Sequence, residues 1–498
     1  MPARTSHSKL DLDARRAVGE QAAKQLPASS HAEWEPSPDR PDPVELLVAQ
    51  DVVREPDLVP VRHGRMMVSP FTFYRGAAAV MAADLAGQPS SGLDVQLCGD
   101  AHLSNFGGYA SPERQLLFGL NDFDETLPGP FEYDLKRMAA SFTIAGRNNG
   151  FTPTDTAAVT AESVKAYRVT MAELAAMRTL QIWYASMSED DIRAGMSAAQ
   201  QEAAAASDHK GHRKGHSSRG VGDDTPSPTD VAKSIKKADK TLRKAYSRDS
   251  LQALSRLAEV VDGRYRIVHQ PPVVVPLREL DGAWGLSTSR LLGVVEDQLQ
   301  AYQASLSDDR RLLLQKFHIV DVARKVVGVG SVGTRAFIVL LQGRDNQDPL
   351  FLQVKEASRS VLEDHLPHSS FANPGQRVVE GQRLMQAASD IFLGWTRGVA
   401  EDRFYYWRQL RDMKVSATVE TMHPLGMTFY ARMCGRALAL AHGRTGDPVA
   451  LAAYLGPGDD LDQALTAFSA RYADQNARDH ERFVRAAESG SIHAVHGV

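Results

Sequence analysis

One stretch of the sequence differs from the rest because it combines strand-forming residues with a cluster of glycines. Residues 323–343 (ARKVVGVGSVGTRAFIVLLQG) and 349–357 (PLFLQVKEA) are rich in Val, Ile, Phe and Leu. Apolar runs of this composition, interrupted by glycine, predict a β-hairpin system. Residues 404–410 (FYYWRQL) predict a further strand, and residues 377–389 (RVVEGQRLMQAAS) predict a helix. The fold must therefore accommodate a β-rich unit late in the chain.

Most of the remaining sequence has helical character. Helix-forming composition covers 71–86, 154–206, 288–317 and 421 to the C-terminus. Two short apolar runs that end in acidic residues, VQLCGD (95–100) and QLLFGLNDFD (115–124), predict strands. We therefore predict an α+β protein in four parts: a polar, Pro-rich N-terminal arm (1–45), a helical part (46–320) with a flexible, non-hydrophobic insertion (207–230), a β-rich part (321–412) and C-terminal helices (413–498).

The overall composition is that of a globular protein with nearly balanced charge. Hydrophobic residues make up 43% of the 498 residues, and the formal net charge is −4. This charge gives no reason to expect nucleic acid or an anionic membrane as a partner, and no apolar run is long enough to predict a transmembrane helix. Cys98 and Cys434 form no CxxC pair, and the N-terminus has no apolar segment typical of a signal peptide. We expect a cytoplasmic protein, of an oligomeric state that the sequence does not indicate.

Two polar motifs follow the two short apolar runs. The first is Gly99–Asn105 (GDAHLSN), and the second is Asn121–Glu125 (NDFDE). Transfer of a phosphoryl group from ATP needs a carboxylate near the acceptor hydroxyl, and an amide oxygen and a carboxylate to hold Mg²⁺. Asp100, Asn105 and Asp122 supply these groups in the order and approximate spacing of a kinase catalytic loop and metal motif. Each motif taken alone is also compatible with a polar turn without catalytic function.

A glycine-rich motif lies between the strand-like runs of the β-rich part. In GVGSVG, Gly328, Gly330 and Gly333 would let backbone N–H groups approach phosphates closely, with Ser331 among them. A dinucleotide-binding fold expects a helix directly after such a motif, but the strand-like run AFIVLL follows here. The order favours a hairpin that folds over a nucleotide, and a tight hairpin without a ligand is the alternative.

A lysine and a glutamate follow at kinase-like distances. Lys355 ends a strand-like alternation twenty-two residues beyond Gly333, where it could pair with ATP phosphates. Glu380 lies twenty-five residues further, on a predicted helix, and could hold Lys355 by an ion pair. A surface lysine on an edge strand and a surface glutamate are the alternatives. If Lys355 and Asp122 serve one nucleotide, they must lie within about 10 Å of each other.

The motifs resemble those of a known superfamily. GDAHLSN resembles the HGDxHxxN catalytic loop of aminoglycoside phosphotransferases and choline kinases, with Cys98 in place of the first His. In that superfamily an Asp on the following helix braces the catalytic loop, and Asp134 of FEYD (131–134) matches it. The chain as a whole more closely resembles a bacterial family, domain of unknown function 2252, which is grouped with kinase-like folds. The matching stretches are SPFTFYRGAAAVMAADLA, CGDAHLSNFG, NDFDETLPGPFEYDLKRMAAS, VVGVGSVGTR, LFLQVKEA and WRQLRDMK.

The resemblance implies a two-lobed protein-kinase-like fold with its lobes encoded in swapped order. An ordinary kinase places the glycine-rich loop, Lys, Glu and hinge strand before the catalytic loop and metal motif, whereas here they come after. Circular permutation is tolerated when native termini lie at the surface. The hinge, whose backbone would meet adenine, is then expected near Gln409 and Leu410.

The implied function is Mg²⁺-ATP-dependent phosphotransfer to a small molecule. Asp100 would orient or deprotonate the acceptor, and Asn105 and Asp122 would bind Mg²⁺, with Asp124 as a possible second carboxylate. His102 would shape the loop by hydrogen bonding. The side chains of Arg75 and Arg137 are compatible either with phosphate or substrate binding or with structural ion pairs.

Three other functions fit parts of the pattern. A kinase-like scaffold can also transfer AMP to protein, which would release pyrophosphate. A pseudokinase would bind nucleotide as a sensor or partner-binding module, but such sites usually lose one of the groups that Asp100, Asn105, Asp122 and Lys355 supply. A metal hydrolase joined to an unrelated β-rich domain lacks HxH or HExxH spacing. The Asp-Phe-Asp form of the metal motif, in place of Asp-Phe-Gly, argues against a regulated protein kinase.

Overall fold

The structure is a computed structural model that describes residues 10–211, 250–280, 287–326, 328–399, 402–410, 413–495 and 497, with some residues between 236 and 246. It has a mixed α+β fold, as the sequence predicts. The predicted insertion at 207–230 begins inside helix α9 (Glu189–Gly211), and its residues from 212 onward lie outside the described part of the chain.

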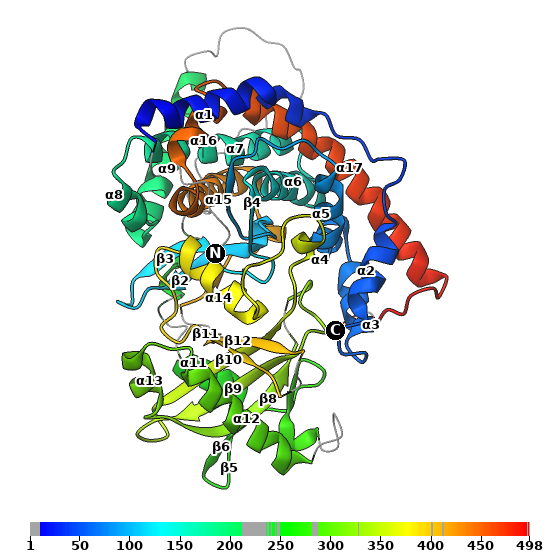
Figure 1. Ribbon diagram of the computed structural model, residues 1–498, viewed down its shortest axis with the longest axis vertical. Coiled ribbons are helices and arrows are strands. Elements are labelled where there is room, and N and C mark those ends of the chain that lie inside the picture. The colour runs from blue at the N-terminus through cyan, green and yellow to red at the C-terminus, as the bar shows by residue number, and fades with distance from the viewer. Residues whose placement is uncertain are drawn as a thin grey trace.

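Helices from the first and last parts of the chain pack into one body, at the upper end of Figure 1. Helix α15 (Pro424–Thr445) lies against α7 (Pro153–Ala175), and α6 (Glu132–Asn148) contacts both α7 and α17 (Asp460–Glu488). Glycine permits the close approach of α15 to α7, because a Cβ on Gly435 would come within 2.1 Å of the Ser163 carbonyl oxygen. Residues far apart in the sequence therefore build one helical core.

Helix α6 is buried along most of its length, including charged positions in its first two turns. Lys136 is only 3% exposed, and its ammonium nitrogen lies 5.0 Å from the centre of the Phe468 ring. Burial lowers the pKa of Lys136 to about 8, although the carboxylate of Glu132 acts in the opposite direction. The native state therefore disfavours the charge of this lysine.

The pKa of Lys136 predicts a pH-dependent stability. Between about pH 8 and pH 10.5 the unfolded chain binds the proton that native Lys136 has lost, so the free energy of unfolding should rise with pH in this window. At pH 7 both states are charged, and a Lys136→Met variant should be more stable than the wild type by up to about 3 kcal/mol. Urea denaturation at pH 7 and pH 10 measures both effects. An equal rise with pH in wild type and variant would contradict the assignment to Lys136.

The β-rich part forms a six-stranded antiparallel sheet at the lower end of Figure 1, with strand order β11-β12-β10-β9-β8-β7. Its strands are β7 (Val274–Pro276), β8 (His318–Lys325), β9 (Ala336–Gln342), β10 (Pro349–Ala357), β11 (Gly394–Arg397) and β12 (Phe404–Gln409). The antiparallel pairs β8–β9 and β9–β10 confirm the predicted hairpins. Helices α12 (Thr288–Gln303) and α13 (Asp308–Leu314) cover one face, and α11 (Ser250–Leu257) packs on the other.

Two small sheets hold the polar motifs of the first part of the chain. Strand β1 (Asp94–Leu97) pairs with β4 (Leu127–Pro130), and β2 (Phe106–Ala110) lies between β3 (Leu116–Leu120) and β13 (Val415–Ser416). Both predicted strands are thus present as β1 and β3. Since β1 ends just before GDAHLSN and β3 just before NDFDE, the small sheets fix where each motif begins.

Helix α14 (Pro374–Met385) links the two ends of the molecule. It contacts β10, β11 and β12 of the large sheet, and also β1 and α15 on the helical side. Figure 1 shows it between the large sheet and the helical body. Side chains on α14 can therefore reach both the sheet and the polar motifs.

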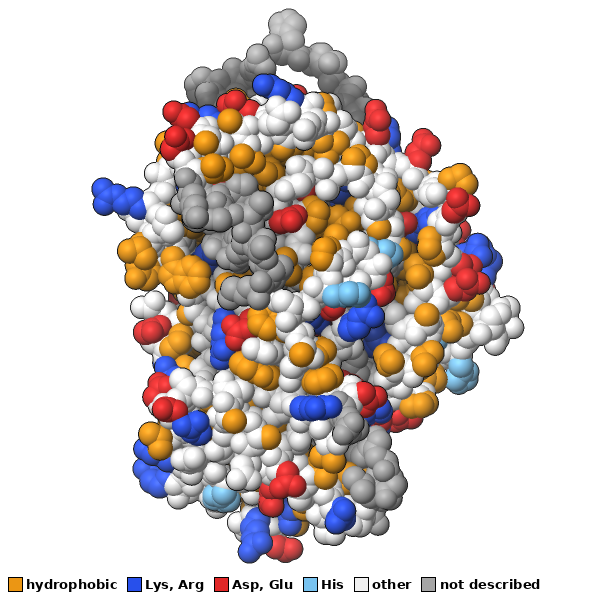
Figure 2. All heavy atoms as spheres, in the orientation of Figure 1, with side chains coloured by type: hydrophobic (Ala, Val, Ile, Leu, Met, Phe, Trp, Pro, Cys, Tyr) orange, Lys and Arg blue, Asp and Glu red, His pale blue; other side chains and the backbone are white. Residues whose placement is uncertain are grey.

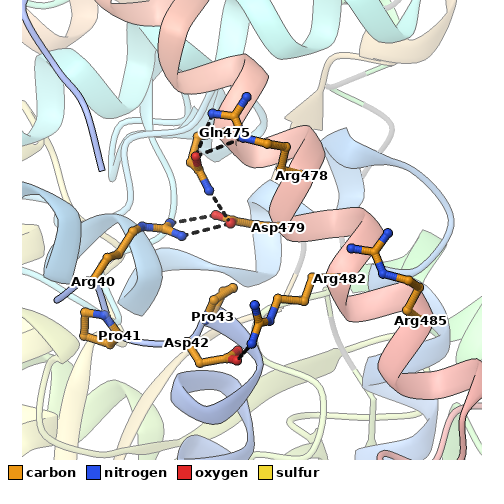
Figure 3. A pocket seen from close by; sticks show the side chains of 9 residues that line it. All are labelled: Arg40, Pro41, Asp42, Pro43, Gln475, Arg478, Asp479, Arg482 and Arg485. Carbon is orange, nitrogen blue, oxygen red and sulfur yellow. Dashed lines mark hydrogen bonds and ion pairs between the residues drawn. The ribbon is translucent and has the colours of Figure 1, made fainter. Parts of the chain in front are cut away.

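The N-terminal segment lies on the outside of the helical body (Figure 1). Helix α1 (Leu12–Gln25) packs on α16 (Pro448–Leu455), and Arg40 forms ion pairs with Asp84 at 2.6 Å and Asp479 at 2.7 Å. A cavity of about 360 Å³ beside Arg40 is lined by residues of this segment and of α17 (Figure 3): Arg40, Pro41, Asp42, Pro43, Gln475, Arg478, Asp479, Arg482 and Arg485. Each arginine in it has a partner within the fold, so the cavity is a structural junction.

The remaining elements are short or lie at the surface. They are α2 (Pro43–Asp51), α3 (Val59–Met66), α4 (Pro70–Gly76), α5 (Ala78–Ala86), α8 (Thr179–Tyr184), β5 (Ala258–Val261) and β6 (Arg264–Ile267). Within the described ranges, no helix is both long and apolar enough to cross a bilayer. Figure 2 shows basic and acidic side chains interspersed over the face drawn, in keeping with the net charge of −4.

Candidate functional site

The acidic turn after β3 is held from two sides. Phe123 is 1% exposed and anchors the turn in the helical core. Arg377 of α14 donates hydrogen bonds to the backbone carbonyl oxygens of Asp124, at 2.7 Å, and Thr126, at 2.6 Å. Because the backbone is fixed in this way, the carboxylates of Asp122 and Asp124 are held next to the large sheet.

Lys355 reaches these carboxylates from strand β10. Its ammonium nitrogen lies 2.6 Å from Asp124 Oδ2 and 3.8 Å from Asp122 Oδ1. The predicted separation of about 10 Å or less between Lys355 and Asp122 is confirmed, although the two residues are far apart in the sequence. Tyr406, the cross-strand partner of Lys355 on β12, donates its hydroxyl to Asp124 Oδ1 at 2.6 Å. Lys355 is therefore a buried member of a cluster and not a surface residue.

The cluster distributes its charge unevenly between the two carboxylates. Burial disfavours the charge of Asp124, but the ion pair with Lys355 and the hydrogen bond from Tyr406 hold the pKa of Asp124 below its usual value. Burial and the nearby charge of Asp124 raise the pKa of Asp122. Asp122 Oδ1 is moreover a buried atom without a hydrogen-bond partner. Negative charge at Asp122 is thus only partly compensated by the protein.

This arrangement fits a Mg²⁺ ion. The side-chain amide of Asn105 donates to the Asp100 carbonyl oxygen at 2.7 Å, which leaves its own oxygen available as a ligand. The N–H of Asn121 donates to the Asn105 carbonyl oxygen at 2.8 Å, so the two motifs are in direct contact. Mg²⁺ takes oxygen ligands, which Asn105, Asp122 and Asp124 supply. Among the described residues, no three His, Cys, Asp or Glu side chains are placed to hold a metal ion together. A metal ion at this position would therefore need the amide oxygen of Asn105 as a ligand.

Asp100 is oriented by an arginine. Arg137 of α6 donates to Asp100 Oδ1 at 2.8 Å, and its guanidinium lies 3.9 Å from the centre of the Tyr74 ring. Of the two roles that the sequence left open for Arg137, the structure shows the ion pair. His102 Nδ1 accepts a hydrogen bond from the Ser104 N–H at 3.2 Å. Burial, with Arg75 and Arg137 nearby, lowers the pKa of His102 far below its usual range, so a neutral His102 shapes the loop.

Asp134 braces the loop that carries Asp100. Its carboxylate accepts hydrogen bonds from the N–H groups of Cys98, at 2.7 Å, and Gly99, at 3.0 Å. The same carboxylate lies 3.2 Å from His442 Nε2 on α15. All of these contacts are buried or nearly so, and they connect the start of the loop to the centre of the helical body. This is the position that the resemblance implies for Asp134.

An Asp134→Asn substitution is expected to destabilise the protein and to impair the loop. An amide keeps the shape of the carboxylate but turns one acceptor into a donor, so the N–H of Cys98 or Gly99 loses its partner. The expected loss is about 1–3 kcal/mol in the free energy of unfolding, measured by urea denaturation. Asp364→Asn, at a side chain that is 68% exposed, is the control. Equal stability of the two variants would show that Asp134 does not brace the loop.

The glycine-rich loop closes over the cluster. It connects the antiparallel strands β8 and β9, and Gly328 and Gly333 have φ values of +66° and +89° that favour glycine. The Ser331 hydroxyl lies 3.3 Å from Asp124 Oδ2 and 3.5 Å from the Lys355 ammonium. The predicted strand–loop–strand arrangement is confirmed, and the loop lies where Lys355 and the acidic turn meet.

Residues 54–65 fasten this loop from outside. Arg54 donates to the Val332 carbonyl oxygen at 2.6 Å, and the Glu55 N–H donates to that of Gly333 at 2.7 Å. Arg65 donates to the Gly328 carbonyl oxygen at 2.6 Å. Leu58, Val61, Val326 and Val332 form a small apolar cluster beside these bonds. The first part of the chain thus fixes the conformation of a loop that the second part encodes.

The predicted ion pair between Lys355 and Glu380 is wrong for this structure. Glu380 pairs with Arg383, one turn along α14, at 3.0 Å, whereas Lys355 pairs with the acidic turn. The face of α14 that meets the acidic turn carries Arg377 and Gly381, where a Cβ would come within 2.4 Å of Thr126. Glu380 lies about 100° around the helix from Gly381, and its side chain is paired with Arg383 and not directed to Lys355.

The backbone N–H groups at the end of β12, where the adenine contact is expected, already have partners in this structure. The Gln409 N–H donates to the Asp390 carboxylate, and the Leu410 N–H donates to the Phe351 carbonyl oxygen at 2.9 Å. Both donors are therefore engaged within the protein. Gln409 and Leu410 do lie where the chain leaves the large sheet toward β13, which pairs with β2 in the small sheet beside the loop that carries Asp100.

Several site residues were not predicted. Tyr406, Arg377 and Arg408 all contact the acidic turn, and the Arg408 guanidinium donates to the Asn121 carbonyl oxygen at 3.2 Å. Lys414 interacts with the same charges, and burial together with Arg408 lowers its pKa to about 8. Tyr406 and Arg408 alternate along β12 within FYYWRQL, so strand periodicity could have placed them on one face. Their neighbours on β10 could not be predicted, because these depend on the register between β12 and β10.

Comparisons with known proteins give one family. A sequence model described as "Uncharacterized protein conserved in bacteria (DUF2252)" matches residues 54–222 and 224–486, which is most of the chain. No curated protein and no solved structure matches the sequence or the fold.

Proposed function

We propose that this chain, which belongs to the DUF2252 family of bacterial proteins, is a Mg²⁺-ATP-dependent phosphotransferase that acts on a small molecule. The observation that carries the proposal is the meeting of Lys355 with Asp122 and Asp124, at 3.8 and 2.6 Å. A lysine at the end of a strand, two carboxylates, an asparagine amide and a glycine-rich hairpin are the groups that phosphoryl transfer from ATP uses. In this chain these groups come from two segments more than 200 residues apart in the sequence, 105–124 and 328–355.

We further propose that the fold is a circularly permuted kinase-like fold with two lobes. From β8 onward the chain order is that of an ordinary kinase: glycine-rich hairpin, Lys355, helix α14, strand β12 and a linker to the helical body. The loops with Asp100 and Asp122, which would come last in an ordinary kinase, come first here. The link from β12 to β13 supports this proposal, since β13 pairs with β2 next to the catalytic loop.

Each residue has a role in the proposed reaction. Asn105, Asp122 and Asp124 would hold Mg²⁺, which when bound offsets the charge of the phosphates. Lys355 holds Asp124 in this structure and would pair with phosphate oxygens. Asp100, whose carboxylate is fixed by Arg137, would orient the acceptor hydroxyl and receive its proton.

Analysis of the products formed from ATP tests the proposal. The purified protein is incubated with Mg²⁺ and ATP in pools of small hydroxyl compounds, and ADP, AMP and pyrophosphate are quantified. Formation of ADP together with a phosphorylated compound is expected. Formation of pyrophosphate would indicate AMP transfer instead. Binding of ATP without any product, in every pool, would contradict an enzyme and leave a nucleotide-binding protein.

A further inference from the structure

Arg75 of helix α4 is a half-buried cation without a counter-ion among the described residues. Its Nε is a buried atom with no hydrogen-bond partner, and across the described residues its guanidinium makes neither a hydrogen bond nor an ion pair. The guanidinium carbon of Arg75 lies over the Phe71 ring, 5.8 Å from the centre of the ring. A poorly solvated charge without a partner costs free energy that the fold does not recover elsewhere. The structure therefore contains an arginine that lacks an anion.

The backbone around Arg75 is held on both sides. Arg137 donates to the Tyr74 carbonyl oxygen at 2.8 Å, and Arg62 donates to the Gly76 carbonyl oxygen at 3.1 Å. The Arg75 carbonyl oxygen lies against the glycine-rich loop, within 3.2 Å of where a Cβ on Gly330 would be. A side chain whose two flanking residues are held by hydrogen bonds is pre-organised for binding.

Arg75 also lies beside the proposed acceptor end of the site. Arg137, which donates to the Tyr74 carbonyl oxygen, also donates a hydrogen bond to Asp100 Oδ1 at 2.8 Å and so orients that carboxylate. The charges of Asp100 and Glu420 act on Arg75, yet neither carboxylate forms an ion pair with it. His102 in the same loop is neutral, since burial and the charges of Arg75 and Arg137 lower its pKa far below its usual range. Among the described residues of this corner, Arg75 is thus a cation that remains open to a ligand.

We infer that Arg75 binds an oxyanion, a phosphoryl or phosphate-type group, next to Asp100. The guanidinium presents N–H donors in a planar fork that matches two oxygens of such a group. The inference rests on the proposed function and adds to it a recognition element on the acceptor side. The oxyanion has two sources: an anionic group of the acceptor itself, or the phosphoryl group of the nucleotide during transfer.

Titration with inorganic phosphate tests the inference and separates the two sources. Phosphate binding is measured by calorimetry in wild type and Arg75→Gln, once with saturating Mg²⁺-ADP and once with saturating Mg²⁺ and a non-hydrolysable ATP analogue. We expect Arg75→Gln to weaken phosphate binding about tenfold or more. If phosphate binds beside the ATP analogue, the group belongs to the acceptor. If it binds only beside ADP, Arg75 holds the transferred phosphoryl group.

Two results would overturn the inference: absence of phosphate binding to the wild type, or equal phosphate binding by the wild type and Arg75→Gln. Arg147→Gln, which breaks a surface pair with Asp474, is the matched control and should bind phosphate normally. A role in stability alone would instead lower the melting temperature of Arg75→Gln without changing phosphate affinity. Failure of the wild type to bind any nucleotide would contradict the proposed function, and phosphate titration of the nucleotide-free protein would still test Arg75.

Discussion

Replacement of Asp122 by alanine is expected to abolish the turnover of Mg²⁺-ATP without destabilising the protein. Asp122 Oδ1 is buried without a hydrogen-bond partner, and the neighbouring carboxylate of Asp124 helps to raise the pKa of Asp122. Removal of one carboxylate from a close pair relieves repulsion, so the free energy of unfolding should stay the same or increase. Loss of a metal ligand should lower kcat by roughly a thousandfold, since a bound metal contributes several kcal/mol to the transition state.

The combination of the two effects distinguishes a functional from a structural aspartate. Turnover of ATP and the midpoint of urea denaturation are measured for wild type and Asp122→Ala under the same conditions. Asp474→Ala removes a carboxylate that is 58% exposed on α17, and should change neither quantity. Unchanged turnover in Asp122→Ala would exclude Asp122 as a metal ligand. A marked loss of stability would show that Asp122 serves the fold.

Asp122 and Lys355 also show what could be read from the sequence. Each follows a short apolar run, and a polar side chain at the end of a strand that is otherwise buried suggests a site. That the two residues meet was predicted from the assumption that both serve one nucleotide, and the observed contact agrees with it. The role of Asp134 was predicted from the resemblance to the kinase-like superfamily, whereas the glycine-rich hairpin was predicted from the local order of strand, glycines and strand.

The errors arose where a contact depends on the direction of a side chain. Glu380 was expected to hold Lys355 because its position along the chain is suitable, but the rotation of α14 presents Arg377 to the acidic turn instead. Tyr406 was missed because its bond to Asp124 requires the register of β12 on β10. Helix rotation and strand register are set by packing over the whole interface, which short motifs do not encode.

These differences change the interpretation of the lysine. With Glu380 as its partner, Lys355 would have been held by a residue outside the proposed metal site. In the structure its partners are the proposed metal ligands themselves, and Ser331 of the glycine-rich loop lies next to Lys355 and Asp124. Entry of Mg²⁺ and phosphates would therefore require Lys355 to exchange a carboxylate for phosphate oxygens. Lys355 thus has two roles that mutation can separate, charge balance without nucleotide and phosphate binding with it.

Replacement of Lys355 by methionine is expected to reduce both stability and turnover. Lys355 is 2% exposed, and its loss leaves Asp124 and Asp122 side by side without the cation that pairs with them directly. Removal of one partner from a buried ion pair costs about 3–5 kcal/mol, and the partial exposure of Asp124 favours the lower end of that range. Turnover should fall by on the order of a hundredfold or more, even at a temperature where the variant is folded, because a charged contact to phosphate is lost.

A second substitution separates the two roles of Lys355. In the double variant Lys355→Met with Asp124→Asn, no unpaired charge remains at the position of the broken pair. The free energy of unfolding should therefore recover most of its loss, and a double-mutant cycle gives the coupling between the two residues. Turnover should not recover, because the cation for the phosphates is still missing and Asp124, a proposed Mg²⁺ ligand, is lost as well. If folded Lys355→Met turned over ATP at the wild-type rate, Lys355 would act only in charge balance, and the proposed nucleotide site would have lost the residue that most directly supports it.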